Sequence, residues 1–176
     1  MTRGIRKFAL AAHLAFSVGW IGAVVAYLAL GVSAVTSHDA QTVRAAWIAM
    51  ELTGWYAIVP LALAALLTGL VMSLGTTWGL LRHYWVVFSL VLTILAIVFL
   101  LLHMPTVSFL ASVAQEVDGA ELAVLGGDLF HSGVGLLVLL VITGLNVYKP
   151  RGMTPYGWRK QHEKRNDDRA VATRSE

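Results

Sequence analysis

The 176-residue sequence contains no cysteine, which removes several classes of site before any motif is considered. Disulfide bonds, thiolate-bound metal ions and iron–sulfur clusters all require cysteine. A metal ion held by this chain would therefore need ligands from histidine, carboxylate, methionine or tyrosine side chains.

Charged residues are also scarce, at 13% of the chain against about 25% in an ordinary soluble domain. Hydrophobic residues instead make up 57%, and they form four long runs at about residues 5–35, 43–74, 84–106 and 122–148. Runs of at least ~18 apolar residues are typical of transmembrane helices. The first run is too long for a secretory signal peptide, whose apolar region spans about 7–15 residues. The sequence predicts an all-α protein that crosses a lipid bilayer four times.

The connections between these runs are short, which favours antiparallel neighbours and a transmembrane up-down-up-down four-helix bundle. Pro105 is expected to close the third helix, and Pro60 is expected to kink the second. Residues 1–150 would then form one transmembrane domain. Residues 151–176 would form a basic tail, either disordered or a frayed helix at the membrane interface.

The positive charges are distributed very unevenly between the two sides of this bundle. Twelve of the 13 Lys and Arg residues fall on the side of the two termini, and only Arg44 falls on the other. Because Lys and Arg in short flanks mark the cytoplasmic face, both termini are expected to be cytoplasmic. A basic tail directly after a spanning helix suits anionic lipid headgroups, so no nucleic-acid partner is expected.

Four histidines, His13, His83, His103 and His131, lie in or beside the apolar runs. Ionisable side chains are costly at membrane depth, so they indicate function more often there than in a soluble protein. Twenty residues separate His83 from His103, which is about 30 Å of helix and matches the hydrocarbon thickness. In the four-span arrangement His13 falls near the level of His83, and His131 near that of His103. The sequence therefore predicts an inner and an outer pair.

Carboxylates add to the predicted outer level. Asp128 and His131 are three residues apart and share a helix face. Glu51 lies about two turns into the second helix from the same side. Glu51, His103, Asp128 and His131 are thus expected to form one polar cluster, in which carboxylates orient or join the ligating histidines.

Small residues in the first and fourth helices predict either ordinary helix contacts or space for a flat macrocycle. They include Gly19, Gly22, Gly133 and Gly135. Tyr27 is expected to be an interface or packing residue.

Three functions fit these features. The first is a haem b protein with two bis-histidine sites, His13 with His83 and His103 with His131, that carries electrons across the membrane to a respiratory or redox partner. The second is a copper or zinc permease or accessory protein that uses the cluster of Glu51, His103, Asp128 and His131. The third is a structural subunit of a larger membrane complex. No P-loop, dinucleotide fingerprint or nucleophile–base motif is recognisable, so an electron carrier is expected rather than a self-contained enzyme.

Five segments carry a resemblance: HLAFSVGWIGAV (13–24), ELTGWYAIVPLALAALLTGL (51–70), SLGTTWGLLRHYWVV (73–87), LLHMP (101–105) and VYKPRGMTPYG (147–157). They resemble a group of uncharacterised four-span bacterial integral membrane proteins of actinobacterial type. That resemblance implies the four-helix fold and a location in the bacterial cytoplasmic membrane. The single histidines carried by helices are more loosely similar to copper-resistance D-type membrane proteins and to small bis-histidine cytochromes b, which implies copper or haem.

Overall fold

The computed structural model describes residues 2–75, 79–117 and 127–174, without the side chains of 164 and 167–174. Within these ranges the chain is helical and forms no β-strand, which confirms the all-α prediction. The elements are α1 (Arg3–Thr36), α2 (Ala40–Thr53), the π-helical turn η1 (Gly54–Ile58), α3 (Val59–Gly75), α4 (Tyr84–Glu116), α6 (Leu129–Tyr148) and α7 (Pro155–Arg174).

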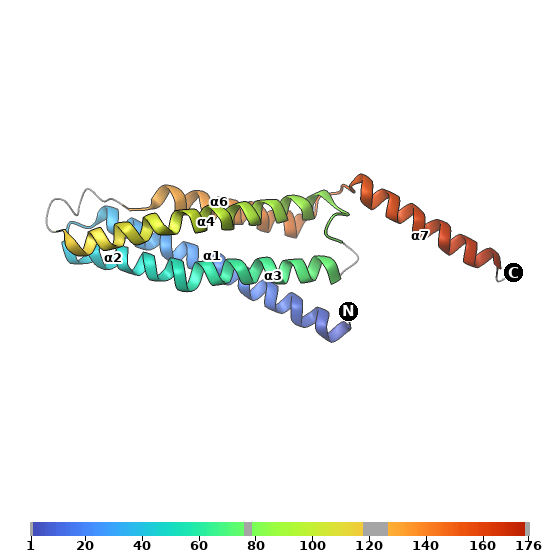
Figure 1. Cartoon of the computed structure of the whole chain (residues 1–176), viewed down its shortest axis with the longest axis horizontal. Helices are drawn as coiled ribbons and strands as arrows, with labels where there is room; N and C mark the ends of the chain where they lie inside the picture. Colours follow the sequence, from blue (N-terminus) through green and yellow to red (C-terminus); the bar gives the residue numbers. More distant parts are fainter. Residues whose placement is uncertain (1, 76–78, 118–126, 175–176) are drawn as a thin grey trace.

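The bundle has four rods, because α2, η1 and α3 run on as one helix of 36 residues. Both α1 and α4 pack against this rod and against α6, so α1 and α4 are diagonal to each other. The N-terminus and the start of α7 lie at the same end of the bundle (Figure 1). We call the opposite end, where α1 turns into α2, the loop end.

All four rods are long and apolar enough to cross a membrane, with mean hydropathies between 1.9 and 3.0. Only 11–28% of each apolar window is buried inside the protein. The outward-facing side chains are therefore apolar as well, which is the pattern expected when lipid covers the bundle. The protein is a multi-pass membrane protein.

The buried residues of the central helices recur alternately three and four positions apart. This spacing is the heptad pattern of left-handed bundles. The series are Trp20, Val24, Tyr27, Gly31 and Ala34 in α1, and Met104, Val107, Ala111 and Ala114 in α4.

Pro105 does not close the third helix, so that prediction is wrong. The helix α4 continues for eleven residues beyond the proline, to Glu116. Proline removes one backbone hydrogen bond from the helix. Val107 and Ala111 are buried where α4 contacts α2, and this burial offsets the free energy of the lost hydrogen bond. The side chain of Arg44 then donates hydrogen bonds to carbonyl groups at the C-terminal end of α4.

Pro60 is expected to kink the second helix, and the structure has the π-helical turn η1 just before it. The N–H of Val59 donates to the carbonyl of Gly54, five residues earlier. A proline ring crowds the carbonyl four residues before it, here that of Tyr56, and a widened turn relieves such crowding.

The tail begins as a capped helix. Thr154 is the N-cap of α7, since its hydroxyl accepts a hydrogen bond from the N–H of Gly157 (3.1 Å), and Pro155 follows at the first helical position. The N–H of Thr154 donates to the carbonyl of Arg82 (3.0 Å), which ties the tail to the segment before α4. Of the two expected forms of the tail, the structure shows the helix.

The start of the fourth spanning helix also differs from the prediction. The helix α6 begins at Leu129. Residues 122–126 of the predicted helix lie outside the described part of the chain.

Candidate metal centre

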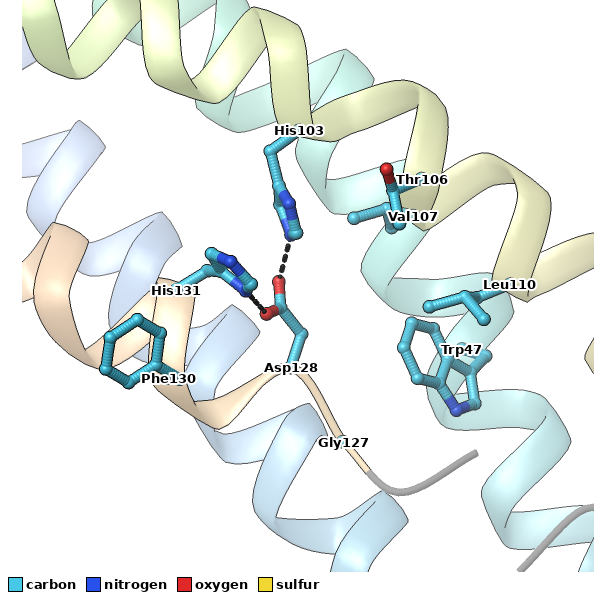
Figure 2. Close-up of a pocket in the computed structure, with 9 residues that line it drawn as sticks. All are labelled: Trp47, His103, Thr106, Val107, Leu110, Gly127, Asp128, Phe130 and His131. Carbon is cyan, nitrogen blue, oxygen red and sulfur yellow. Dashed lines mark hydrogen bonds and ion pairs between the residues drawn. The ribbon is translucent and has the colours of Figure 1, made fainter. Parts of the chain in front are cut away.

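Asp128, the residue immediately before α6, joins two histidines from different helices. Its Oδ2 lies 2.7 Å from Nε2 of His103 on α4, and its Oδ1 lies 2.7 Å from Nδ1 of His131 on α6. Figure 2 shows the carboxylate bridging the two imidazole rings, with one oxygen directed at a nitrogen of each. We call His103, Asp128 and His131 the His–Asp–His centre.

A third donor completes the surroundings of this carboxylate. The hydroxyl of Tyr27 on α1 donates to Oδ2 of Asp128 at 3.0 Å. Because an ionised carboxylate only accepts hydrogen bonds, both imidazoles must donate to it, His103 through Nε2 and His131 through Nδ1. The hydrogen bonds from His103, His131 and Tyr27 all stabilise the ionised form of this carboxylate.

Two glycines allow Asp128 to sit this deep in the bundle. A side chain on Gly127 would collide with the backbone carbonyl of Gly31 on α1. The chain therefore crosses α1 at van der Waals contact just before it enters α6. The hydroxyl of Ser132 also donates to the carbonyl of Asp128 and fixes the first turn. The side chain of Asp128 is only 7% exposed as a result, against 17% for the side chain of His103 and 40% for that of His131.

The two imidazole rings stack on each other, with centroids 4.1 Å apart and planes inclined by 30°. Phe99, one turn before His103, stacks on both rings at centroid distances of 6.1 and 5.7 Å. An axial pair must approach a haem from its two opposite faces. Rings stacked at 4.1 Å leave no room for a macrocycle between them, so this arrangement of His103 and His131 does not fit bis-histidine ligation of one haem.

The same arrangement fits a single metal ion. Three ligand atoms, one each from His103, Asp128 and His131, lie within 4.8 Å of one another. Two ligands about 2.05 Å from a tetrahedral zinc ion are about 3.3 Å apart. Each N···O distance of 2.7 Å would therefore open by roughly 0.6 Å on binding, a shift within the reach of side-chain torsions.

The centre lies between two cavities. A cavity of about 250 Å³ is lined by His103, Asp128 and His131 together with Trp47, Leu110 and neighbouring residues towards the loop end. A larger cavity of about 510 Å³ reaches the same three residues from the middle of the bundle. Both cavities are lined mainly by apolar side chains, so the His–Asp–His centre is the polar part that they share.

The structure brings together three of the four residues predicted for the outer cluster. Glu51 on α2 is half-buried but is not among the described ligands that lie within 4.8 Å of one another. His103, Asp128 and His131 meet because α6 starts at the level of His103, about 20 Å short of the C-terminal end of α4.

The predicted inner pair occupies two different surroundings. Nδ1 of His13 lies 3.1 Å from the hydroxyl of Thr68 on α3, and its ring lies against Gly69. His83 is the N-cap residue of α4, with a backbone bridge to Met153 of the tail segment. Joint ligation by His13 and His83 stays a prediction.

Sequence reasoning missed Tyr27 as part of the site. Its hydroxyl contacts Asp128 across 101 positions of sequence, and the residue is 5% exposed at the heptad position that α1 directs into the bundle. Because nearly every face of α1 is apolar, the sequence carried no clear signal for this contact. The expected glycine contacts also differ: a side chain on Gly22, Gly133 or Gly135 would meet no atom within 4 Å.

Comparison with known proteins adds no assignment, since no family model, curated protein or solved structure matches the chain. The centre is therefore interpreted from its own geometry.

Proposed function

We propose that the protein binds a divalent transition-metal ion, Zn²⁺ or Cu²⁺, at the His–Asp–His centre and acts as a metal-ion permease or accessory protein of the membrane. One observation carries this proposal: ligand atoms of His103, Asp128 and His131 lie within 4.8 Å of one another in a bundle of four strongly apolar helices. Burying ionisable side chains at membrane depth costs free energy, so such side chains usually have a function, such as binding an ion.

The donor set selects the class of ion. Imidazole and carboxylate ligands without thiolate suit Zn²⁺ and Cu²⁺ better than Cu⁺, which prefers sulfur. Three protein ligands leave one tetrahedral position for water or an exchanging ligand, whereas a purely structural zinc site normally has four. The centre is therefore suited to an ion that enters and leaves.

The uneven charge supports an orientation for this site. Twelve of the 13 Lys and Arg residues belong to the side of the termini, which we take as cytoplasmic. The centre would then face the non-cytoplasmic half of the membrane, and the cavity of about 250 Å³ would open towards that side.

Competition titration of Zn²⁺ against a chelator, on detergent-purified protein, tests the proposal. The wild-type protein should bind one Zn²⁺ per chain. Asp128→Asn should weaken binding at least about a hundredfold, equivalent to ~2.7 kcal/mol, because it removes the anionic ligand.

Asp39→Asn is the matched control. Asp39 is an exposed residue near the loop end, where it caps α2 by accepting hydrogen bonds from Thr42, and asparagine caps helices equally well. Equal losses in the two variants would mean that charge near the loop end, and not ligation, controls binding. A Soret band in the purified protein, with no zinc or copper bound, would favour haem instead.

A further inference from the structure

At the end of the bundle that carries the two termini, the tail is folded against the segment that precedes α4 (Figure 1). The hydroxyl of Thr154 donates to the carbonyl of Leu81 (2.5 Å), and its N–H donates to the carbonyl of Arg82 (3.0 Å). We call these two segments, residues 79–84 and 148–160, the tail junction. Their hydrogen bonds fix the start of α7 relative to the bundle.

Gly157, in the first turn of α7, determines how closely the two segments approach. A side chain on Gly157 would collide with the backbone carbonyl of Arg82. Gly157 is buried, although its neighbours Tyr156 and Trp158 are both exposed. Because the obstacle is backbone and not a flexible side chain, the junction has this geometry only with glycine at this position.

The tail junction lies at the level where the bundle leaves the lipid. The exposed surface on its bundle side is apolar: Phe88 of α4 is 58% exposed, and Val147 of α6 is 69% exposed. The junction itself exposes four aromatic side chains, those of Tyr84, Tyr148, Tyr156 and Trp158. Tyrosine and tryptophan are enriched where a membrane protein meets the lipid headgroups. Phospholipid headgroups are therefore expected around the junction.

The same surface is strongly basic. Residues 149–165 contain six lysines and arginines and one glutamate. Both segments of the junction contribute cations, which are Arg82 before α4, Lys149 and Arg151 after α6, and Arg159 and Lys160 in α7. Lys160 pairs with Glu163 at 3.0 Å but is still close enough to Arg82 for their positive charges to repel each other. An anion bound at this surface would offset that repulsion.

We infer that the tail junction binds the headgroup of an anionic phospholipid of the phosphatidylglycerol class. Lysine and arginine beside a membrane attract anionic lipids, and arginine can bind phosphate oxygens through two N–H groups. The exposed rings of Tyr148 and Trp158 suit the boundary between headgroups and acyl chains. The inference goes beyond metal binding and does not depend on it.

The site is confined to the junction and does not extend along the whole basic tail. Beyond its first turns α7 points away from the bundle, so its later residues leave the level of the headgroups (Figure 1). Arg3 and Arg6, at the start of α1, lie at the same end of the bundle in a stretch where residues 2–8 are all exposed. They carry charge without a packed surface, and so they provide a matched control.

Native mass spectrometry of the detergent-purified full chain tests the inference, with equal amounts of dioctanoyl-phosphatidylglycerol and dioctanoyl-phosphatidylcholine as probes. The wild-type protein should retain the anionic lipid at least about tenfold more than the zwitterionic one. Arg151→Gln/Arg159→Gln should lower this ratio at least about fivefold, because two cations of the junction are lost. Arg3→Gln/Arg6→Gln removes the same charge at the same end and should leave the ratio unchanged.

Gly157→Ala separates the folded junction from charge alone, because it keeps every cation and forces the tail away from Arg82. It should lower the lipid ratio as the substitution of Arg151 and Arg159 does, and size-exclusion chromatography checks that the bundle stays intact. An unchanged ratio in Gly157→Ala would overturn the inference. Equal retention of the two lipids by the wild type, equal losses in the two double variants, or displacement of phosphatidylglycerol by an equal concentration of inorganic phosphate would overturn it as well. If Gly157→Ala cannot be purified, the comparison of the two double variants decides.

Discussion

Gly127→Ala should displace the central carboxylate of the centre without changing any ligand. The added methyl group would collide with the backbone carbonyl of Gly31 and with the side chain of Val35. The φ angle of Gly127 is not in the left-handed region, so alanine is allowed by its backbone and the penalty is steric. The chain before α6 must therefore move away from α1, and Asp128 moves with it.

The expected cost follows from this contact. Overpacking by one methyl group against a rigid backbone costs about 1–3 kcal/mol. Gly133→Ala, on the adjacent α6, provides the opposite case: its side chain would meet no atom within 4 Å, so helix propensity alone should stabilise it by about 0.5–1 kcal/mol. The free energies of unfolding of the two variants should differ by roughly 1.5–4 kcal/mol.

Two measurements on the detergent-solubilised protein check this reasoning. Reversible unfolding in mixed micelles gives the difference in free energy of unfolding. Zn²⁺ titration should show a loss of about 10–100-fold in Gly127→Ala, the range typical when the support of a ligand is disturbed, and none in Gly133→Ala. Equal stability and equal Zn²⁺ affinity in the two variants would refute the role assigned to the contact between Gly127 and Gly31.

Three further substitutions test other contacts. Tyr27→Phe should lower Zn²⁺ affinity about tenfold, because Asp128 loses one of its three donors, and the same titration measures it. Arg44→Gln should destabilise the protein by about 1–3 kcal/mol in mixed-micelle unfolding, since charged hydrogen bonds to carbonyl groups of α4 are lost. Thr154→Ala should cost α7 about 1 kcal/mol and speed amide exchange in its first turn.

Each of these substitutions has a control. Tyr56→Phe removes the hydroxyl of an 80% exposed tyrosine and should leave Zn²⁺ affinity unchanged. Arg44→Lys keeps the charge but not the two-point contact, so it should recover part of the lost stability. Thr154→Ser keeps the capping hydroxyl and should behave as the wild type; if it resembles Thr154→Ala instead, the cap is not the cause.

Much of the fold follows from hydropathy. Long apolar runs and short connections predict four spanning helices and their antiparallel order, and the structure has both. The boundaries are less predictable, because Pro105 stops a helix only where packing does not outweigh one lost hydrogen bond. Here the buried Val107 and Ala111 hold α4 together past the proline.

The candidate site is predictable where its contacts are local. Asp128 and His131 are three residues apart, so their meeting follows from helix geometry. His103 joins them through a depth argument based on rise per residue. The positions of Tyr27 and Glu51 could not be predicted in this way. Nearly every face of these helices is apolar, so the sequence gives little information on how each helix is rotated about its axis. That rotation places Tyr27 on the carboxylate and Glu51 outside the cluster.

X-ray absorption at the zinc edge, on the wild-type protein loaded with one equivalent of Zn²⁺, tests the central claim most directly. The account predicts a shell of nitrogen and oxygen ligands at about 2.0–2.1 Å, with the outer-shell scattering of two imidazoles. His131→Ala should reduce that scattering to one imidazole. A shell without imidazole, or a protein that retains no zinc or copper at all, would contradict a metal centre at His103, Asp128 and His131.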